Sequence, residues 1–145
     1  MHAPSRDLMR FMRLTVLAGA ALAGAVAAHA QAILPGTASY LERQALPPDA
    51  VLDVSLEDVT RADAPATVVS TAHVEPTGQP PIRFGIGYAP EQIDASHRYA
   101  VRASIKRGNQ LLLATDTPHP VPATALAQGE PGRIDVLLRN ARDKP

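Results

Sequence analysis

The sequence predicts an all-β fold: a single antiparallel β-sandwich of about seven strands, preceded by a helical signal peptide. From residue 36 onward, short runs of alternating apolar and polar residues are separated by clusters of Pro, Gly and Asp, as is typical of such sandwiches. No long stretch in this part repeats apolar residues at helical spacing. The first 30 residues, in contrast, have the composition of an export signal.

This export signal has the three parts that signal peptides share. Arginines among the first 13 residues make its start basic, and an uncharged apolar run follows over residues 14–28. An Ala-His-Ala segment supplies the small residues that a signal peptidase recognises, so we expect cleavage after Ala30 and a mature chain starting at Gln31. Cleavage after Ala32 and an uncleaved membrane anchor are the alternatives, although a spanning helix needs about 20 apolar residues.

We therefore expect a signal peptide over residues 1–30 and a β-sandwich domain over residues 31–145, with a core at about 36–139. The sequence contains no Cys, so an apolar core rather than disulfides has to stabilise the domain. The same absence excludes thiolate metal sites and thiol catalysis. Basic and acidic residues number 14 each, so the chain lacks the basic surface that nucleic acid binding requires.

The first two predicted strands cover residues 36–43 and 51–59. The first carries apolar residues at Ala38 and Tyr40, and the prolines that follow stop it because proline cannot donate to a ladder. The second alternates along its whole length, so one face is buried and the other is wet. Its apolar residues are Leu52, Val54 and Leu56, and its polar residues are Asp53, Ser55 and Glu57.

The next two predicted strands cover residues 67–74 and 82–88. In the third strand, Val68 and Val69 compete for the core. The loop over residues 76–81 is too rich in Pro and Gly to pair. The fourth strand places Ile82, Phe84, Ile86 and Tyr88 on one face, and Arg83, Gly85 and Gly87 on the other.

The last three predicted strands cover residues 98–106, 110–115 and 133–139. One helical turn is expected in the connection that precedes them, after Pro90, and a tight Arg-Gly-Asn hairpin joins the first two. A Pro- and Ala-rich loop over residues 117–132 precedes the last strand. The end of the chain after this strand is expected to be frayed.

The mature chain shows no recognisable catalytic motif. It has no Gly-x-Ser-x-Gly elbow. Asp53 and Glu57 share a strand face but lie about 13 Å apart, too far for a glycosidase pair. The histidines stand isolated, so no zinc or calcium ligand set is expected; they are His73, His97 and His119. We therefore expect a non-enzyme without metal or cofactor.

Two residues near the fifth strand have structural interpretations. Asp94 is expected to cap the turn before that strand by accepting backbone hydrogen bonds. Tyr99 follows a corner, where a tyrosine hydroxyl often bonds to the main chain. Both residues are thus predicted to stabilise the fold.

Four parts of the chain carry a distinctive strand and turn pattern: residues 51–59 with 61–65, 81–84, 88–90 with 93–94, and 97–103. This pattern resembles that of the YbaY/YscW-like family, which includes lipoprotein chaperones of type III secretion. The similarity extends from about Gly36 to Leu138. It implies a small envelope protein with a transthyretin- or immunoglobulin-like sandwich. The lipid-accepting Cys of the family is missing, so any pilot-like role here would be lipid-independent.

From these observations we expect an exported, non-enzymatic accessory or binding protein of the bacterial envelope, periplasmic or secreted, with an envelope protein as partner. No nucleic acid partner and no stable membrane insertion after signal cleavage are expected. A carrier of a small apolar ligand and a lipid-independent chaperone or pilot are the alternatives. A hydrolase would require polar groups to converge, from among Asp53, Glu57, His73 and His97.

Two surfaces are candidates for binding. The first is the outward face of the fourth strand, where Gly85 and Gly87 leave the backbone bare beside Arg83. Glycines at such positions mark a bulge or bend, or they admit a partner strand at a sheet edge. The second candidate is the loop over residues 117–132, because long loops on rigid scaffolds often carry binding. A plain connection kept extended by its prolines is the alternative for this loop.

Overall fold

The computed structural model describes residues 31–76 and 78–143. The predicted signal peptide, residues 1–30, and its cleavage site lie outside the described residues, apart from the predicted new N-terminus, Gln31. Within the described part of the chain, no helix combines the length and hydropathy needed to cross a membrane.

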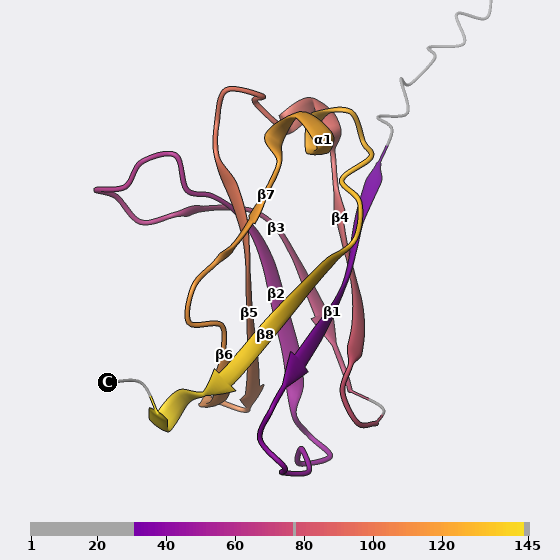
Figure 1. Cartoon of the computed structure of the whole chain (residues 1–145), viewed down its shortest axis with the longest axis vertical. Helices are drawn as coiled ribbons and strands as arrows, with labels where there is room; N and C mark the ends of the chain where they lie inside the picture. The colour runs from indigo at the N-terminus through magenta and orange to yellow at the C-terminus, as the bar shows by residue number, and fades with distance from the viewer. Residues whose placement is uncertain (1–30, 77, 144–145) are drawn as a thin grey trace, which may run out of the picture.

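The described chain is almost entirely β-structure, as predicted (Figure 1). Every predicted strand is present with its ends displaced by one residue at most, except that the first begins four residues earlier than expected, at Ala32, and ends three residues earlier, at Tyr40. The strands are β1 (Ala32–Tyr40), β2 (Val51–Asp58), β3 (Thr67–Val74), β4 (Ile82–Tyr88), β5 (Tyr99–Arg107), β6 (Gln110–Ala114), β7 (His119–Val121) and β8 (Ile134–Asn140). The helical segments are α1 (Ala123–Ala127), η1 (Pro90–Gln92) and η2 (Ala141–Asp143).

The strands form one continuous sheet that curls into a nearly closed barrel. Their order is β3-β2-β5-β6-β8-β1-β4, and β7 pairs with β5 beside β6. The predicted two-layer sandwich is therefore not confirmed. Alternation along a strand identifies its buried face, but it does not identify the strand's neighbours.

One pair of strands departs from the predicted antiparallel arrangement. β1 and β8 run parallel, with Gly36 opposite Ile134 and Tyr40 opposite Leu138. β8 is joined on its other side to β6 by a short antiparallel ladder. The all-antiparallel prediction is wrong at β1 and β8, because the long connections between them leave either direction possible.

The barrel remains open between its two edge strands. β3 and β4 lie side by side, yet no backbone ladder joins them in the described part of the chain. The hydroxyl of Ser70 on β3 donates a hydrogen bond to the carbonyl of Gly87 on β4. Side chains rather than a ladder therefore close this seam.

The segment over residues 117–132, predicted to be a loop without secondary structure, contains two elements, β7 and α1. α1 lies across the upper end of the barrel in Figure 1, and Leu126 points from it into the core with no exposed surface. The hydroxyl of Tyr88 donates a 2.8 Å hydrogen bond to the carbonyl of Leu126. Both elements are too short to show a periodic pattern in the sequence.

The interior of the barrel is filled with apolar side chains from all around the sheet. All four aromatic residues of the described chain are buried in it: Tyr40, Phe84, Tyr88 and Tyr99. The largest fully buried side chains are Leu34, Leu52, Leu56, Ile86, Ile105, Leu113, Leu126 and Leu138. The chain is thus stabilised by its core, as the absence of Cys requires.

Candidate functional site

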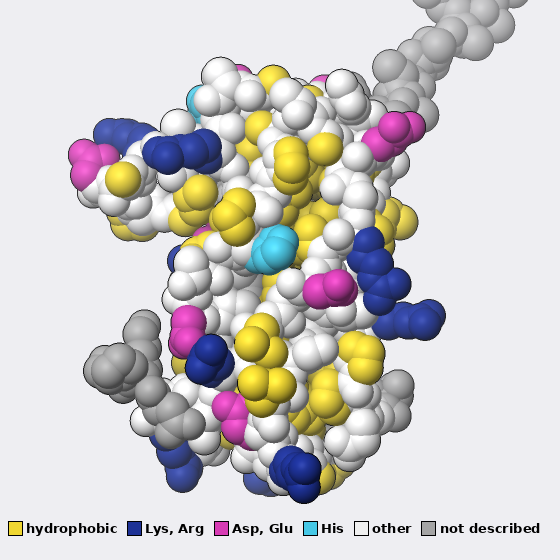
Figure 2. Space-filling model, viewed as in Figure 1, with side chains coloured by type: hydrophobic (Ala, Val, Ile, Leu, Met, Phe, Trp, Pro, Cys, Tyr) yellow, Lys and Arg dark blue, Asp and Glu magenta, His cyan; other side chains and the backbone are white. Residues whose placement is uncertain are grey.

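An apolar groove lies on the outside of the barrel, where the loop between β2 and β3 projects beside β5 and β7 (Figure 1). Its volume is about 540 Å³. Figure 2 shows apolar side chains gathered at the base of the projecting loop. We call this surface the proline groove; its apolar residues include Val59, Ala62, Ala100, Pro118, Pro120 and Pro122. Arg98 and His97 also line it.

Ala100 forms the floor of the groove because it faces outward from β5. The residues two positions before and after it carry charge: Arg98, directly before β5, and Arg102, within it. Ala100 is nevertheless only 3% exposed. Its cross-strand neighbours are Glu57 on β2 and Pro120 on β7. A small apolar residue therefore stands between two arginines, and the apolar side chains of the neighbouring segments gather around it to line the groove.

Three prolines at alternate positions form the β7 side of the groove: Pro118, Pro120 and Pro122. Alternate residues of an extended chain direct their side chains to one face and their backbone groups to one edge. β7 pairs with β5 over His119, Pro120 and Val121. Because Pro120 has no N–H, the N–H groups that point toward β5 are those of His119 and Val121. The prolines therefore occupy the positions whose N–H groups would point to the opposite edge. Because proline has no N–H, this edge offers no donors to another strand.

A histidine bridge fastens the base of the projecting loop to the connection between β4 and β5. Nδ1 of His97 lies 2.7 Å from Oδ2 of Asp58, at the end of β2. Nε2 of the same ring lies 3.6 Å from Oδ2 of Asp94. The hydroxyl of Thr60 donates a 2.5 Å hydrogen bond to Oδ1 of Asp58. Both carboxylate oxygens of Asp58 thus have a hydrogen-bond partner. The bridge thereby holds one wall of the groove in place.

These contacts shift the pKa values of the three titratable groups. The hydrogen bond to Asp58, helped by the negative charges of Asp58 and Asp94, raises the pKa of His97 against a smaller opposing effect of burial. Burial alone would raise the pKa of Asp58, but hydrogen bonds from Thr60 and His97 outweigh it and lower the value. Hydrogen bonds from Ser96 lower the pKa of Asp94. All three shifts favour a protonated His97 between two carboxylates.

The two structural interpretations near β5 are confirmed. Oδ1 of Asp94 accepts hydrogen bonds from the backbone N–H and the hydroxyl of Ser96, at 2.9 and 2.6 Å. The backbone N–H of Asp94 donates to the hydroxyl of Tyr99 at 2.9 Å. The Tyr99 ring also stacks against His97, with centroids 6.4 Å apart. These contacts fix the corner from which the rim of the groove is built.

The predicted surface on β4 has a regular backbone. The ladder between β1 and β4 keeps a constant register along its length, so Gly85 and Gly87 do not mark a β-bulge. A methyl group added at Gly85 would lie 3.1 Å from Cγ2 of Ile33, whose side chain is on β1. Ile33 is 64% exposed, so an apolar side chain lies over part of this surface. Binding by Arg83, Gly85 and Gly87 stays a prediction.

The residues considered for acid–base chemistry have different partners. Asp53 contacts His73 across the outer faces of β2 and β3. Glu57 accepts hydrogen bonds from Ser55 at 2.9 Å and from Arg102 at 3.3 Å. His97 belongs to the bridge described above, so these groups do not form one constellation. No cluster of three or more His, Cys, Asp or Glu suited to a metal ion occurs among residues 31–76 and 78–143.

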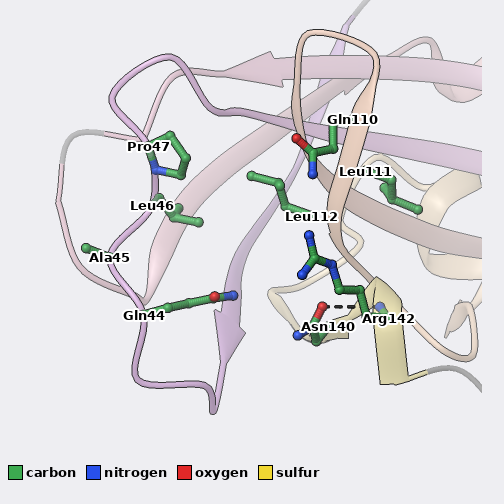
Figure 3. A pocket seen from close by; sticks show the side chains of 9 residues that line it. All are labelled: Gln44, Ala45, Leu46, Pro47, Gln110, Leu111, Leu112, Asn140 and Arg142. Atoms are coloured by element: carbon green, nitrogen blue, oxygen red, sulfur yellow. Dashed lines mark hydrogen bonds between the residues drawn. The ribbon is translucent and has the colours of Figure 1, made fainter.

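A second hollow, of about 220 Å³, lies at the other end of the barrel (Figure 3). The loop between β1 and β2 forms one wall through Gln44 and Leu46, and β6 forms another through Leu112. Asn140 and Arg142 complete it, and the Asn140 side chain accepts a 3.2 Å hydrogen bond from the backbone of Arg142. Amide groups line much of this hollow, whereas apolar surface dominates the proline groove.

Sequence reasoning did not identify the proline groove, although two signals of it were present. Ala100 interrupts the polar outward series of the fifth predicted strand, and Pro118, Pro120 and Pro122 stand at alternate positions. The candidate loop over residues 117–132 was identified from its length, and it supplies one side of the groove. The β2–β3 loop, which supplies the opposite side, gave no signal beyond that of a turn.

Comparisons with known proteins support the resemblance. The chain is 38% identical over 87 residues to the uncharacterized lipoprotein YbaY of Escherichia coli (strain K12), a match that covers 59% of this chain and 46% of that protein. The chain thus spans about half the length of this curated relative. It also resembles a solved structure of an alternative pilotin from the type II secretion system of Vibrio cholerae. The TM-score is 0.69 at 36% identity, over 77% of this chain and 98% of the pilotin chain.

The family model described as type III secretion system lipoprotein chaperone (YscW) matches residues 29–138. This range includes six of the seven predicted strands, all but the final residue of the seventh, and both sides of the proline groove. The predicted resemblance is therefore confirmed, and the chain belongs to the YscW family of type III secretion system lipoprotein chaperones.

Proposed function

We propose that this protein is an exported, non-enzymatic accessory protein of the bacterial envelope that binds a secretion-system protein through the proline groove. The observation that carries the proposal is the apolar outer surface around Ala100, on a strand whose neighbouring outward positions are charged. Family membership supports a chaperone- or pilotin-like role, because relatives are a lipoprotein and a pilotin. The predicted signal peptide supports a periplasmic or secreted location.

The fixed shape of the groove supports a binding role as well. The histidine bridge holds the projecting loop, and backbone hydrogen bonds hold β7 on β5. A surface held in place before binding loses less conformational entropy when its partner arrives. Both walls of the groove are therefore held in place before a partner binds.

Site-directed photo-crosslinking in the natural host tests the proposal. Benzoylphenylalanine replaces Ala62, which is exposed at the edge of the groove, or Thr71, which is exposed on the outer face of β3. After irradiation we expect one defined envelope protein attached at position 62 and none at position 71. Filling the groove with Ala100→Gln or Ala123→Gln should remove the product. Equal labelling at both positions, or a product unaffected by filling, would refute the proposal.

The outer face of β4 is a second candidate surface, because Ile33 presents an exposed apolar side chain over Gly85. A crosslinker at Arg83 in the same experiment distinguishes it from the groove. A product from position 83 alone would transfer the binding role to this surface.

A carrier of a small apolar ligand is less well supported. Ligand pockets usually measure about 300–1,000 Å³, and the space between the strands is filled by side chains without exposed surface. A carried molecule would have to displace several of them. Native mass spectrometry of the protein from its host would reveal such a ligand as added mass.

A further inference from the structure

The proline groove contains a guanidinium, that of Arg98, that forms no ion pair within residues 31–76 and 78–143. Arg98 lines the groove and is exposed. Its guanidinium donates one 3.3 Å hydrogen bond, to the backbone carbonyl of Thr60. Within the described residues no carboxylate lies within ion-pair distance of Arg98. A guanidinium has five N–H donors, so most of its capacity is available to a partner.

The nearby carboxylates are engaged elsewhere. Asp58 accepts hydrogen bonds from Thr60 and His97. Asp94 accepts hydrogen bonds from Ser96 and lies near the other nitrogen of His97. The contacts of these acids are therefore made to groups other than Arg98. On the projecting loop itself, Arg61 and Asp63 carry opposite charges.

The mode of docking is restricted by the edge of β7. A strand that joins a sheet needs donors and acceptors from the edge that receives it. Pro118, Pro120 and Pro122, in and beside β7, have no N–H groups to offer at this edge, and the carbonyl of Pro122 already accepts a 3.1 Å hydrogen bond from the N–H of Leu126. Side chains, rather than a backbone ladder, must therefore supply the contact.

Resting on the proposed function above, we infer that the bound segment carries a carboxylate among apolar side chains, that Arg98 binds this carboxylate, and that the segment does not extend the sheet. The apolar side chains cover Ala100 and the prolines. The carboxylate accepts the paired hydrogen bonds that a guanidinium offers. A segment without an acid would remove water from around Arg98 without supplying a partner for its positive charge, which is unfavourable.

Selection of peptides from a random displayed library tests the inference with the exported protein purified from its host. We expect selected peptides to combine apolar residues with Asp or Glu. Replacing that acid by its amide, or Arg98→Gln in the protein, should each weaken binding about tenfold. The two changes together should weaken it little further, because they remove the same contact. Arg98 is exposed, so Arg98→Gln is expected to fold, and circular dichroism checks this.

The possible failures of the inference and of the proposed function are distinguishable. If the selected peptides lack acids and no longer bind the Ala100→Gln and Ala123→Gln variants, the role of Arg98 would be overturned and binding in the groove supported. Peptides that bind all filled variants normally would overturn both. Pro120→Ala restores one N–H at the free edge, and we expect it to weaken binding by removing apolar surface. Tighter binding to this variant would overturn the docking mode.

Discussion

Replacing Gly36 by Ala tests the packing of β1 between β4 and β8. A Cβ atom at this position would lie 2.5 Å from Cζ of Phe84 and 2.6 Å from the carbonyl oxygen of Ile134, whereas ordinary contacts begin at 3.4 Å. The Phe84 ring can turn aside, but the carbonyl belongs to the backbone of β8. The two parallel strands therefore have to separate by several tenths of an ångström.

We expect Gly36→Ala to lower the free energy of unfolding by about 3 kcal/mol, the upper end for overpacking, because one of the clashing atoms is backbone. For a chain of this size the melting temperature should fall by roughly 10 °C. Urea unfolding followed by circular dichroism measures the loss. An unchanged slope of the free energy of unfolding against urea concentration would show that the variant buries the same surface and keeps the fold.

Two other glycines provide matched controls. A Cβ at Gly85 meets only the Cγ2 atom of the exposed Ile33 side chain, at 3.1 Å, and a Cβ at Gly78 meets nothing within 4 Å. Gly85→Ala and Gly78→Ala should therefore change stability by less than about 1 kcal/mol, within the range of backbone entropy effects. If Gly36→Ala proved as stable as these controls, the parallel packing of β1 on β8 would be refuted.

Three further predictions concern the bridge, the helix across the barrel and the start of the mature chain. NMR titration should give His97 a pKa above 6.5, and Asp58→Asn should lower it; an unshifted value would contradict the bridge. The stabilisation from His97 is present below pH 6.5 and lost as pH rises through its raised pKa, whereas that from both lowered carboxylates is lost as pH falls below 3.8. Leu126→Ala should lower the free energy of unfolding by about 3 kcal/mol, because the fully buried side chain leaves a cavity; a loss under about 1 kcal/mol would show that α1 does not contribute to the core. The mass of the protein from its host should correspond to a chain starting at Gln31, and a mass that includes residues 14–28 would contradict signal cleavage.

The proline groove illustrates how far a site of this kind can be predicted. The loop over residues 117–132 was identified as a binding candidate from its length, and it provides the prolines. The opposite wall comes from the β2–β3 loop and the rim from His97, which lies 39 residues from its partner Asp58. No sequence pattern relates such distant segments. The contrast between Ala100 and its charged neighbours was a local signal that could have been used.

The sequence by itself determined seven of the eight described strands, the buried face of most of them, and the family. Alternation of apolar and polar residues is a local property, so it survives whatever the strands pair with. Only the tertiary structure decided that the sheet closes on itself, that β1 runs parallel to β8, and that three distant segments enclose a groove. Gly36 and Ile134 become neighbours only through this closure, because pairing depends on contacts between residues far apart in the chain and on the twist of the whole sheet.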